Sequence, residues 1–134
     1  DVYKRQGGDS PFDKLPKNQS YLSMNGKEVY KFAVSSMYRD VQTVCDQAGV
    51  KVEDVDWIVP HQANLRIIEA AAHKLKVSGE KCLTAIENLG NTSAASIPIV
   101  LDRANTEGKF KAGDLLVLTA FGAGLTTGAC VLRW

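Results

Sequence analysis

The chain has 134 residues, about the length of one domain, with 45% hydrophobic and 23% charged residues. These proportions are those of an ordinary globular domain and exclude a disordered or fibrous protein. The formal net charge is +1, from 16 Lys and Arg against 15 Asp and Glu that are spread along the chain, so no nucleic-acid partner is expected.

Residues 1–24 show no sustained apolar period and contain two glycines and two prolines. We therefore predict an irregular N-terminal arm. Residues 1–6 look unrelated to the sequence that follows, so we expect part of this arm not to be native to the domain. Residues 25–134 form a single C-terminal domain in this interpretation.

The domain is predicted to begin with an amphipathic helix. Asn25 with Glu28 three residues later is a variant of the capping box, and Gly49 is a typical helix end. Between them, apolar residues recur at intervals of three and four, as a helix requires. These residues are Val29, Ala33, Met37, Val41, Val44 and Ala48.

Two strand–helix units follow. Residues 55–60 are rich in strand-forming residues, and a second helix is predicted to start at Asn64. The pattern repeats with a predicted strand at 81–87, a turn at 90–93 and a helix at 94–106.

The last two predicted strands, 115–121 and 129–134, are joined by a glycine-rich connection that suits an antiparallel hairpin. The apolar stretch 115–131 is interrupted by Thr and Gly, so it is too short and too polar to cross a membrane. No secretory signal pattern opens the chain. We therefore expect a cytoplasmic protein with no membrane partner.

The order of elements predicts the α/β class, with a mostly parallel mixed sheet, helices on both faces and a C-terminal antiparallel hairpin. Such sheets place functional residues at the carboxyl ends of their strands. His61 comes directly after Val59-Pro60, at the end of the first predicted strand, and Asn91 comes directly after Leu89-Gly90, beyond the second.

His61 and Asn91 together could form an oxyanion-binding pair. The helix start near His61 should disfavour the charged imidazolium, and a neutral histidine can donate one N–H to a developing oxyanion. The Asn91 amide offers a second uncharged donor. Both residues also have a structural explanation, because histidine is common in turns at strand ends and asparagine tolerates left-handed backbone angles.

Two other kinds of site are disfavoured. Gly122-Ala123-Gly124 lacks the next glycine of a dinucleotide-binding loop, and the element predicted after it is a strand. His61 and His73 are twelve residues apart, which does not suggest a metal site. We predict no metal and no bound cofactor.

Three segments resemble β-ketoacyl-acyl-carrier-protein synthase III, a thiolase-like condensing enzyme that starts bacterial fatty-acid synthesis. Residues 56–68 resemble its histidine motif, residues 90–98 its asparagine motif, and residues 120–124 its glycine-rich C-terminal loop. They occur in the family's order, and the similarity extends from about Met24 to Trp134. The resemblance implies the C-terminal, thiolase-like half-domain of such an acyltransferase.

The reaction implied by the resemblance is a decarboxylating Claisen condensation of acyl-CoA with malonyl-acyl-carrier protein. In that scheme His61 and Asn91 are the catalytic residues of this half, since they bind the malonyl thioester oxygen and stabilise the enolate. Phe121 matches a residue that packs beside the site and shields it. Coenzyme A and phosphopantetheine thioesters are substrates in this scheme, and no further cofactor is implied.

Three positions in the histidine motif have implied roles in binding. Ala63 and Asn64 match positions that line the pantetheine tunnel, and Arg66 matches a basic residue that contacts the acidic acyl carrier protein. Without the family match, Arg66 is best explained as part of a solvated helix face.

The nucleophilic cysteine of the family has no counterpart here. Cys45 falls in the last turns of a helix, and Cys82 and Cys130 fall in predicted strands. We therefore expect this chain alone to be inactive in condensation and to need an N-terminal half-domain as a partner, in a homodimeric enzyme. Two alternatives stay open, namely a non-catalytic half-domain that associates with itself and a related condensing enzyme of the thiolase superfamily.

Overall fold

The computed structural model describes residues 24–134. The arm predicted for residues 1–24 therefore lies outside the described residues, apart from Met24. The helices and strands, in chain order, are α1 (Gly26–Ala48), β1 (Trp57–Pro60), α2 (Leu65–Leu75), α3 (Ile86–Leu89), α4 (Ser96–Thr106), β2 (Leu115–Gly122) and β3 (Thr126–Arg133). Short 3₁₀ turns at 52–54, 79–81 and 93–95 connect them.

The ends of α1 and α2 lie at the capping residues predicted from the sequence. The Asn25 side chain accepts a hydrogen bond from the Glu28 backbone N–H at 3.3 Å. Gly49 ends α1 with a φ of 69°, which a residue without Cβ adopts at little cost. At the start of α2, the Asn64 side chain accepts from the Arg66 N–H at 2.9 Å. The predicted starts of both helices are confirmed.

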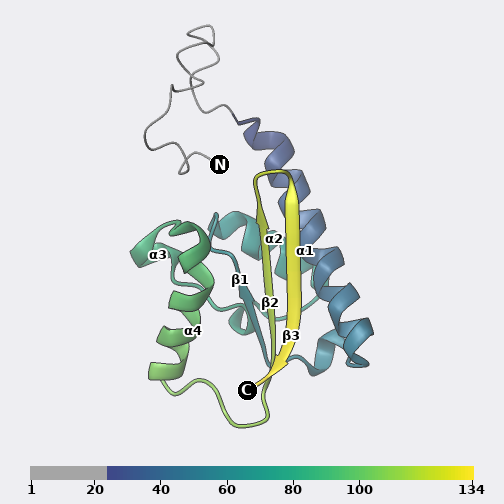
Figure 1. The fold of residues 1–134 in the computed structure, drawn as a ribbon, viewed down its shortest axis with the longest axis vertical. Coiled ribbons are helices and arrows are strands. Elements are labelled where there is room, and N and C mark those ends of the chain that lie inside the picture. The colour runs from purple at the N-terminus through teal and green to yellow at the C-terminus, as the bar shows by residue number, and fades with distance from the viewer. Residues whose placement is uncertain (1–23) are drawn as a thin grey trace, which may run out of the picture.

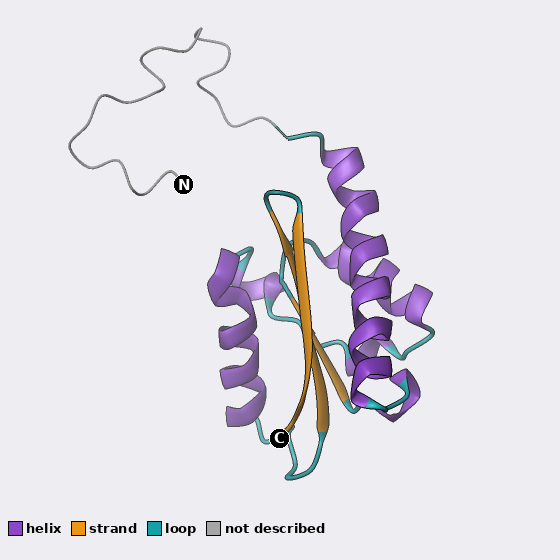
Figure 2. Ribbon diagram, turned by 45° about the vertical axis from the view of Figure 1, so that its right-hand side comes forward, coloured by secondary structure: helices purple, strands orange, loops and turns teal. Residues whose placement is uncertain are grey.

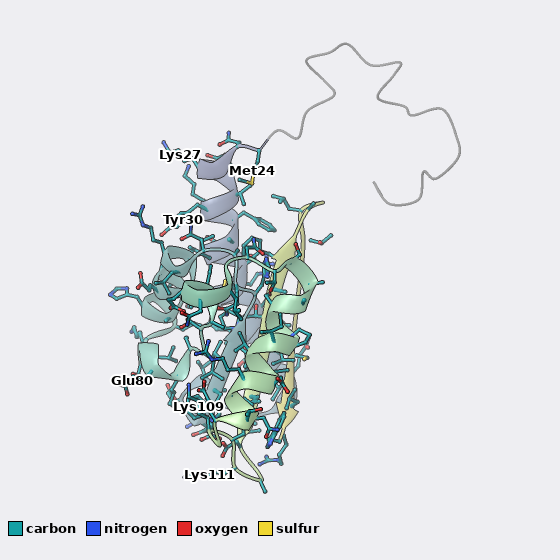
Figure 3. The ribbon with its side chains drawn as sticks, turned by 90° about the vertical axis from the view of Figure 1, so that its left-hand side faces the viewer. Met24, Lys27, Tyr30, Glu80, Lys109 and Lys111 are labelled. Carbon is teal, nitrogen blue, oxygen red and sulfur yellow. The ribbon has the colours of Figure 1, made fainter. Side chains whose placement is uncertain are left out.

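Helix α1 is the longest helix described, at 23 residues. Its first turns extend past the rest of the domain, where Met24 and Tyr30 are exposed (Figure 3). Farther along, its buried residues, which include Ala33 and Val41, pack against the domain. Neither α1 nor any other helix between residues 24 and 134 is long and apolar enough to cross a membrane.

The three strands form one mixed sheet in the order β1-β2-β3. Strand β1 runs parallel to β2, with Pro60 opposite Thr119. Strand β3 returns antiparallel along β2, and the register pairs Gly122 with Thr126 at the hairpin end. The C-terminal hairpin is therefore confirmed, and both of its strands are longer than the sequence indicated (Figure 2).

Helices cover both faces of the sheet, as predicted. Helices α1 and α2 lie on one side and α4 on the other (Figure 1). Adjacent residues of β1 face opposite sides, because side chains alternate along a strand. Ile58 packs in the cluster with Val41 of α1, whereas Val59 packs with Val100 of α4.

The strand predicted at 81–87 is wrong. Only Cys82 forms an isolated parallel bridge, to Ile58, before the chain turns into the short helix α3. The side-chain amide of Gln62 explains why no ladder continues. Its oxygen accepts the Ala85 N–H at 2.9 Å and its nitrogen donates to the Leu83 carbonyl at 3.2 Å, so one side chain satisfies groups that a strand would have paired.

Substitution of Leu116 tests how much the central strand β2 contributes to stability. It lies on β2 with 0% of its surface exposed. We expect Leu116→Ala to lower the free energy of unfolding by about 2–5 kcal/mol, because it leaves a cavity in the core. The same substitution at Leu89, which is 47% exposed, should change it by less than about 0.5 kcal/mol. Equal effects in chemical denaturation would contradict this description of the core.

Candidate active site

His61 is held where β1 ends. Its backbone N–H donates to the Thr119 carbonyl of β2 at 2.8 Å, which extends the parallel pairing by one residue. The imidazole is half-buried, and its ring meets the ring of Phe121 edge-on, with centroids 5.5 Å apart and an interplanar angle of 70°. The ring is therefore fixed by the sheet on one side and by an aromatic side chain on the other.

Burial favours the neutral form of this histidine. Desolvation lowers the pKa of His61 below its ordinary value of 6.5, because water no longer stabilises the charged ring fully. The direction of the shift agrees with the sequence prediction, and the cause in the structure is burial. Near neutral pH the ring thus bears a single proton.

Asn91 reaches the site by a different route from the one predicted. It follows α3 and not a strand, and the residue before it, Gly90, has φ 67° and ψ −161°. That conformation is essentially restricted to glycine. The Asn91 side-chain oxygen accepts the Ser93 N–H at 2.9 Å, so the amide N–H groups remain available to donate elsewhere.

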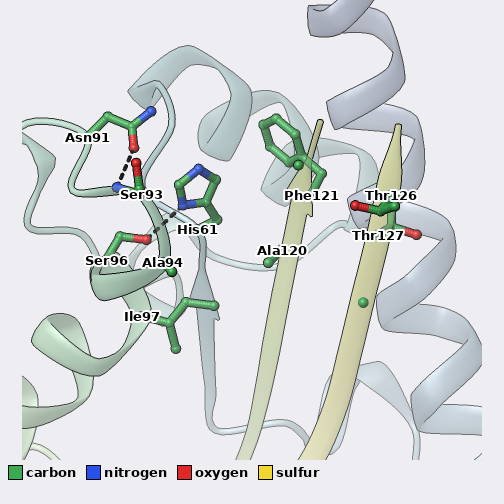
Figure 4. Close-up of a pocket in the computed structure, with 12 residues that line it drawn as sticks. His61, Asn91, Ser93, Ala94, Ser96, Ile97, Ala120, Phe121, Thr126 and Thr127 are labelled. Carbon is green, nitrogen blue, oxygen red and sulfur yellow. Dashed lines mark hydrogen bonds between the residues drawn. The ribbon is translucent and has the colours of Figure 1, made fainter. Parts of the chain in front are cut away.

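A cavity of about 440 Å³ brings the predicted pair together. His61, Asn91 and Phe121 all line it, together with residues from the start of α4 and from the hairpin (Figure 4). The nitrogen His61 Nε2 points into the space between Asn91 and Phe121 (Figure 4). The cavity is therefore lined by an imidazole nitrogen, a carboxamide and an aromatic ring.

The sequence interpretation missed two residues that support this site. Gln62 is 1% exposed, and its side chain joins the end of β1 to the segment before Asn91 through bonds to Pro60, Leu83 and Ala85. Ser96 is 2% exposed, and its hydroxyl lies 2.7 Å from His61 Nδ1. For Ser96, the only signal in the sequence was that serine is common at helix starts, where it often acts as a cap. For Gln62, nothing in the neighbouring sequence indicated that its side chain would be buried.

The remaining predicted binding residues lie outside the lining of this cavity. Ala63 and Phe121 both pack against a cluster of buried residues from α1 and α2. Asn64 uses its side-chain oxygen to cap α2, and Arg66 is exposed in the first turn of that helix. Within residues 24–134, no group of three or more His, Cys, Asp or Glu side chains could hold a metal ion.

Comparisons with known proteins agree on one family. The model for the C-terminal part of 3-oxoacyl-[acyl-carrier-protein] synthase III matches residues 45–134. The β-ketoacyl-[acyl-carrier-protein] synthase III of Clostridium acetobutylicum is 48% identical over 126 residues, covering 93% of this chain and 39% of that protein. The chain thus spans about two fifths of the length of this relative.

Solved structures show the same relation. The crystal structure of 3-oxoacyl-[acyl-carrier-protein] synthase III from Aquifex aeolicus superposes with a TM-score of 0.83 at 52% identity, covering 87% of this chain and 38% of that one. The priming β-ketosynthase of the R1128 polyketide pathway superposes with a TM-score of 0.77 at 35% identity, covering 83% and 34%. The fold is that of a thiolase-like half-domain.

Gln62 provides a test of how the site is held together. Gln62→Leu would leave the Ala85 N–H and two carbonyls without partners, at about 1–3 kcal/mol for a buried unpaired group. We expect it to lower the free energy of unfolding by about 2 kcal/mol or more and to speed hydrogen exchange at Ala85. Gln42→Leu, on the exposed surface of α1, is the matched control. Unchanged exchange at Ala85 in Gln62→Leu would contradict the assignment.

The lowered pKa of His61 predicts a pH dependence of stability. As the pH falls through about 6.5, the unfolded chain takes up this proton before the folded chain does, so the free energy of unfolding decreases. NMR titration should place the His61 midpoint below 6.5, with His73→Gln to remove the other histidine signal. A midpoint at or above 6.5 would contradict the burial of the ring. His61→Gln should flatten the dependence of stability on pH.

Proposed function

Because the chain belongs to the 3-oxoacyl-[acyl-carrier-protein] synthase III family, we propose that it provides the enolate-stabilising half of a condensing active site. The observation that supports this most directly is the cavity that His61 and Asn91 both line, because each of these side chains can donate an uncharged N–H. The proposed reaction is the decarboxylating Claisen condensation that joins an acyl group from acyl-CoA to malonyl-acyl-carrier protein.

In the first step the bond between the malonyl methylene carbon and its carboxylate breaks. Carbon dioxide leaves, and the electron pair of that bond forms an enolate whose negative charge develops on the thioester oxygen. His61 and Asn91 donate their N–H groups to this oxygen, and such donors contribute most where charge develops in the transition state. The enolate carbon then attacks an acyl thioester, and a thiolate leaves.

The neutrality of His61 suits this role. A neutral imidazole can donate a hydrogen bond to the enolate oxygen and keep its proton, whereas a charged imidazolium would readily give its proton up. Burial favours the neutral ring near pH 7. Phe121 covers one side of the imidazole with an apolar ring, which strengthens the electrostatic interaction by excluding water. Both features favour stabilisation of an anion over proton transfer.

Residues at the start of α2 are proposed to bind the pantetheine arm of the substrate and the acyl carrier protein. We assign Ala63 and Asn64 to the passage that holds the pantetheine arm, next to the cluster that contains Phe121. Arg66 is exposed, so its guanidinium can meet an acidic surface of the acyl carrier protein. Coenzyme A and phosphopantetheine thioesters are the substrates in this proposal, and no other cofactor takes part.

The acyl-carrying thiol is proposed to come from outside this chain, from an N-terminal half-domain of a homodimeric cytoplasmic enzyme. Burial raises the pKa of Cys45 and raises that of Cys82 to about 11, so neither is a ready thiolate. Cys130 is exposed on β3. None of the three is among the residues that line the cavity of His61.

A related condensing reaction is the second candidate, because the chain is also similar to a priming β-ketosynthase of polyketide synthesis. The sequence identity is 35% to that enzyme and 52% to the Aquifex synthase III, which favours the first candidate.

The two catalytic roles can be tested in the complete synthase. We expect His61→Ala and Asn91→Ala each to slow malonyl decarboxylation by about 10²- to 10³-fold, because each removes one oxyanion donor. Transfer of the acyl group from acyl-CoA to the enzyme thiol should continue. His73→Ala and Asn88→Ala make the same changes at exposed positions outside the cavity and should leave both steps unchanged. Equal loss of both steps in the cavity variants would overturn the assigned roles.

A further inference from the structure

Ser96 connects α4 to the end of β1. It is the first residue of α4, and its hydroxyl oxygen lies 2.7 Å from His61 Nδ1 and 3.2 Å from the backbone nitrogen of Gln62 (Figure 4). The serine is 2% exposed, so water has little access to these contacts. A hydroxyl this deeply buried is expected to have an acceptor for its own hydrogen.

The direction of each hydrogen bond follows from the donors available. The Gln62 backbone N–H can only donate, so the Ser96 oxygen is the acceptor of that bond. Within residues 24–134, the one other hydrogen-bond partner of this oxygen is His61 Nδ1. If Nδ1 were protonated, the hydroxyl hydrogen would have no acceptor in this part of the chain. If Nδ1 is unprotonated, both groups are satisfied.

The protonation state of the His61 ring determines which of its nitrogens can donate. Burial lowers the pKa of His61, so near neutral pH the imidazole has one proton to place. When Nδ1 accepts the Ser96 hydroxyl, that proton is on Nε2, because the bond made by one ring nitrogen sets the state of the other. Nε2 is the nitrogen that points into the space between Asn91 and Phe121 (Figure 4).

We propose that Ser96 is a positioning residue that holds neutral His61 in the tautomer with its proton on Nε2 and directs this N–H into the cavity. The chemical consequence rests on the proposed function, in which the thioester oxygen accepts that hydrogen bond. In the other tautomer, Nε2 would present a lone pair to the developing enolate and repel it.

The tautomer can be measured without any substrate. In ¹⁵N-histidine-labelled chain with His73→Gln, long-range ¹H–¹⁵N spectra above the His61 pKa should show a protonated Nε2 and an unprotonated Nδ1. Ser96→Ala should shift both nitrogens toward the averaged values of a tautomer mixture, and Ser96→Thr, which keeps the hydroxyl, should restore the original pattern. A proton on Nδ1 in the unsubstituted site, or no change in Ser96→Ala, would overturn the proposal.

Ser36→Ala is the matched control for loss of a buried serine. Ser36 is also 2% exposed, and its hydroxyl donates to the Ala33 carbonyl within α1. This variant should leave the His61 spectrum unchanged. A change as large as that of Ser96→Ala would indicate a general loss of packing and would overturn the specific role of Ser96.

Kinetics in the complete synthase separate this proposal from the proposed function. Ser96→Ala should slow malonyl decarboxylation by about 10- to 100-fold, by analogy with the loss of the orienting partner of a metal-binding histidine, and Ser96→Thr should recover most of the rate. If His61→Ala is impaired and Ser96→Ala is not, the role of Ser96 is overturned alone. If His61→Ala is also unimpaired, the proposed function fails, and the spectra still decide the tautomer.

Discussion

The carboxamide of Gln62 is the contact on which the arrangement of the site depends. It donates to the Pro60 carbonyl at 2.8 Å and bonds to Leu83 and Ala85, so it joins the end of β1 to the segment that leads to Asn91. A longer strand would have used backbone groups for the same purpose. The side chain instead lets the chain turn early into α3, which brings Asn91 to the cavity that His61 lines.

The contact between the Ser96 hydroxyl and His61 determines which nitrogen of the imidazole has the proton. Gln62 uses its side chain to hold the segment before Asn91 and its backbone N–H to bind the Ser96 hydroxyl, which in turn contacts His61. The position of the imidazole and the placement of its proton are therefore coupled to the same junction between β1 and α4. Because all these groups are buried or half-buried, leaving one unpaired is costly, and the arrangement is well determined.

In the proposed function, the cavity of His61 and Asn91 supports enolate formation, and the acyl-carrying thiol comes from another part of the enzyme. The donors of His61 and Asn91 suit the stabilisation of an enolate, whereas burial holds the thiols of Cys45 and Cys82 in their protonated form. In the proposed function, this half-domain therefore supports one of two chemical steps. Such a division is expected where an acyl group and an enolate must be held by different residues and brought together for carbon–carbon bond formation.

Local signals in the sequence determined where α1 and α2 begin and where α1 ends, because Asn25, Asn64 and Gly49 act on backbone groups within a few residues. They also indicated the hairpin and, through short motifs, the pairing of His61 with Asn91. Tertiary structure alone decided that residues 81–87 do not form a strand and that Ser96 contacts His61. Gln62 contacts Leu83 from 21 residues away and Ser96 contacts His61 from 35, and no local pattern encodes such contacts. Burial then determines which polar groups must pair, and burial exists only once the sheet and its helices have packed.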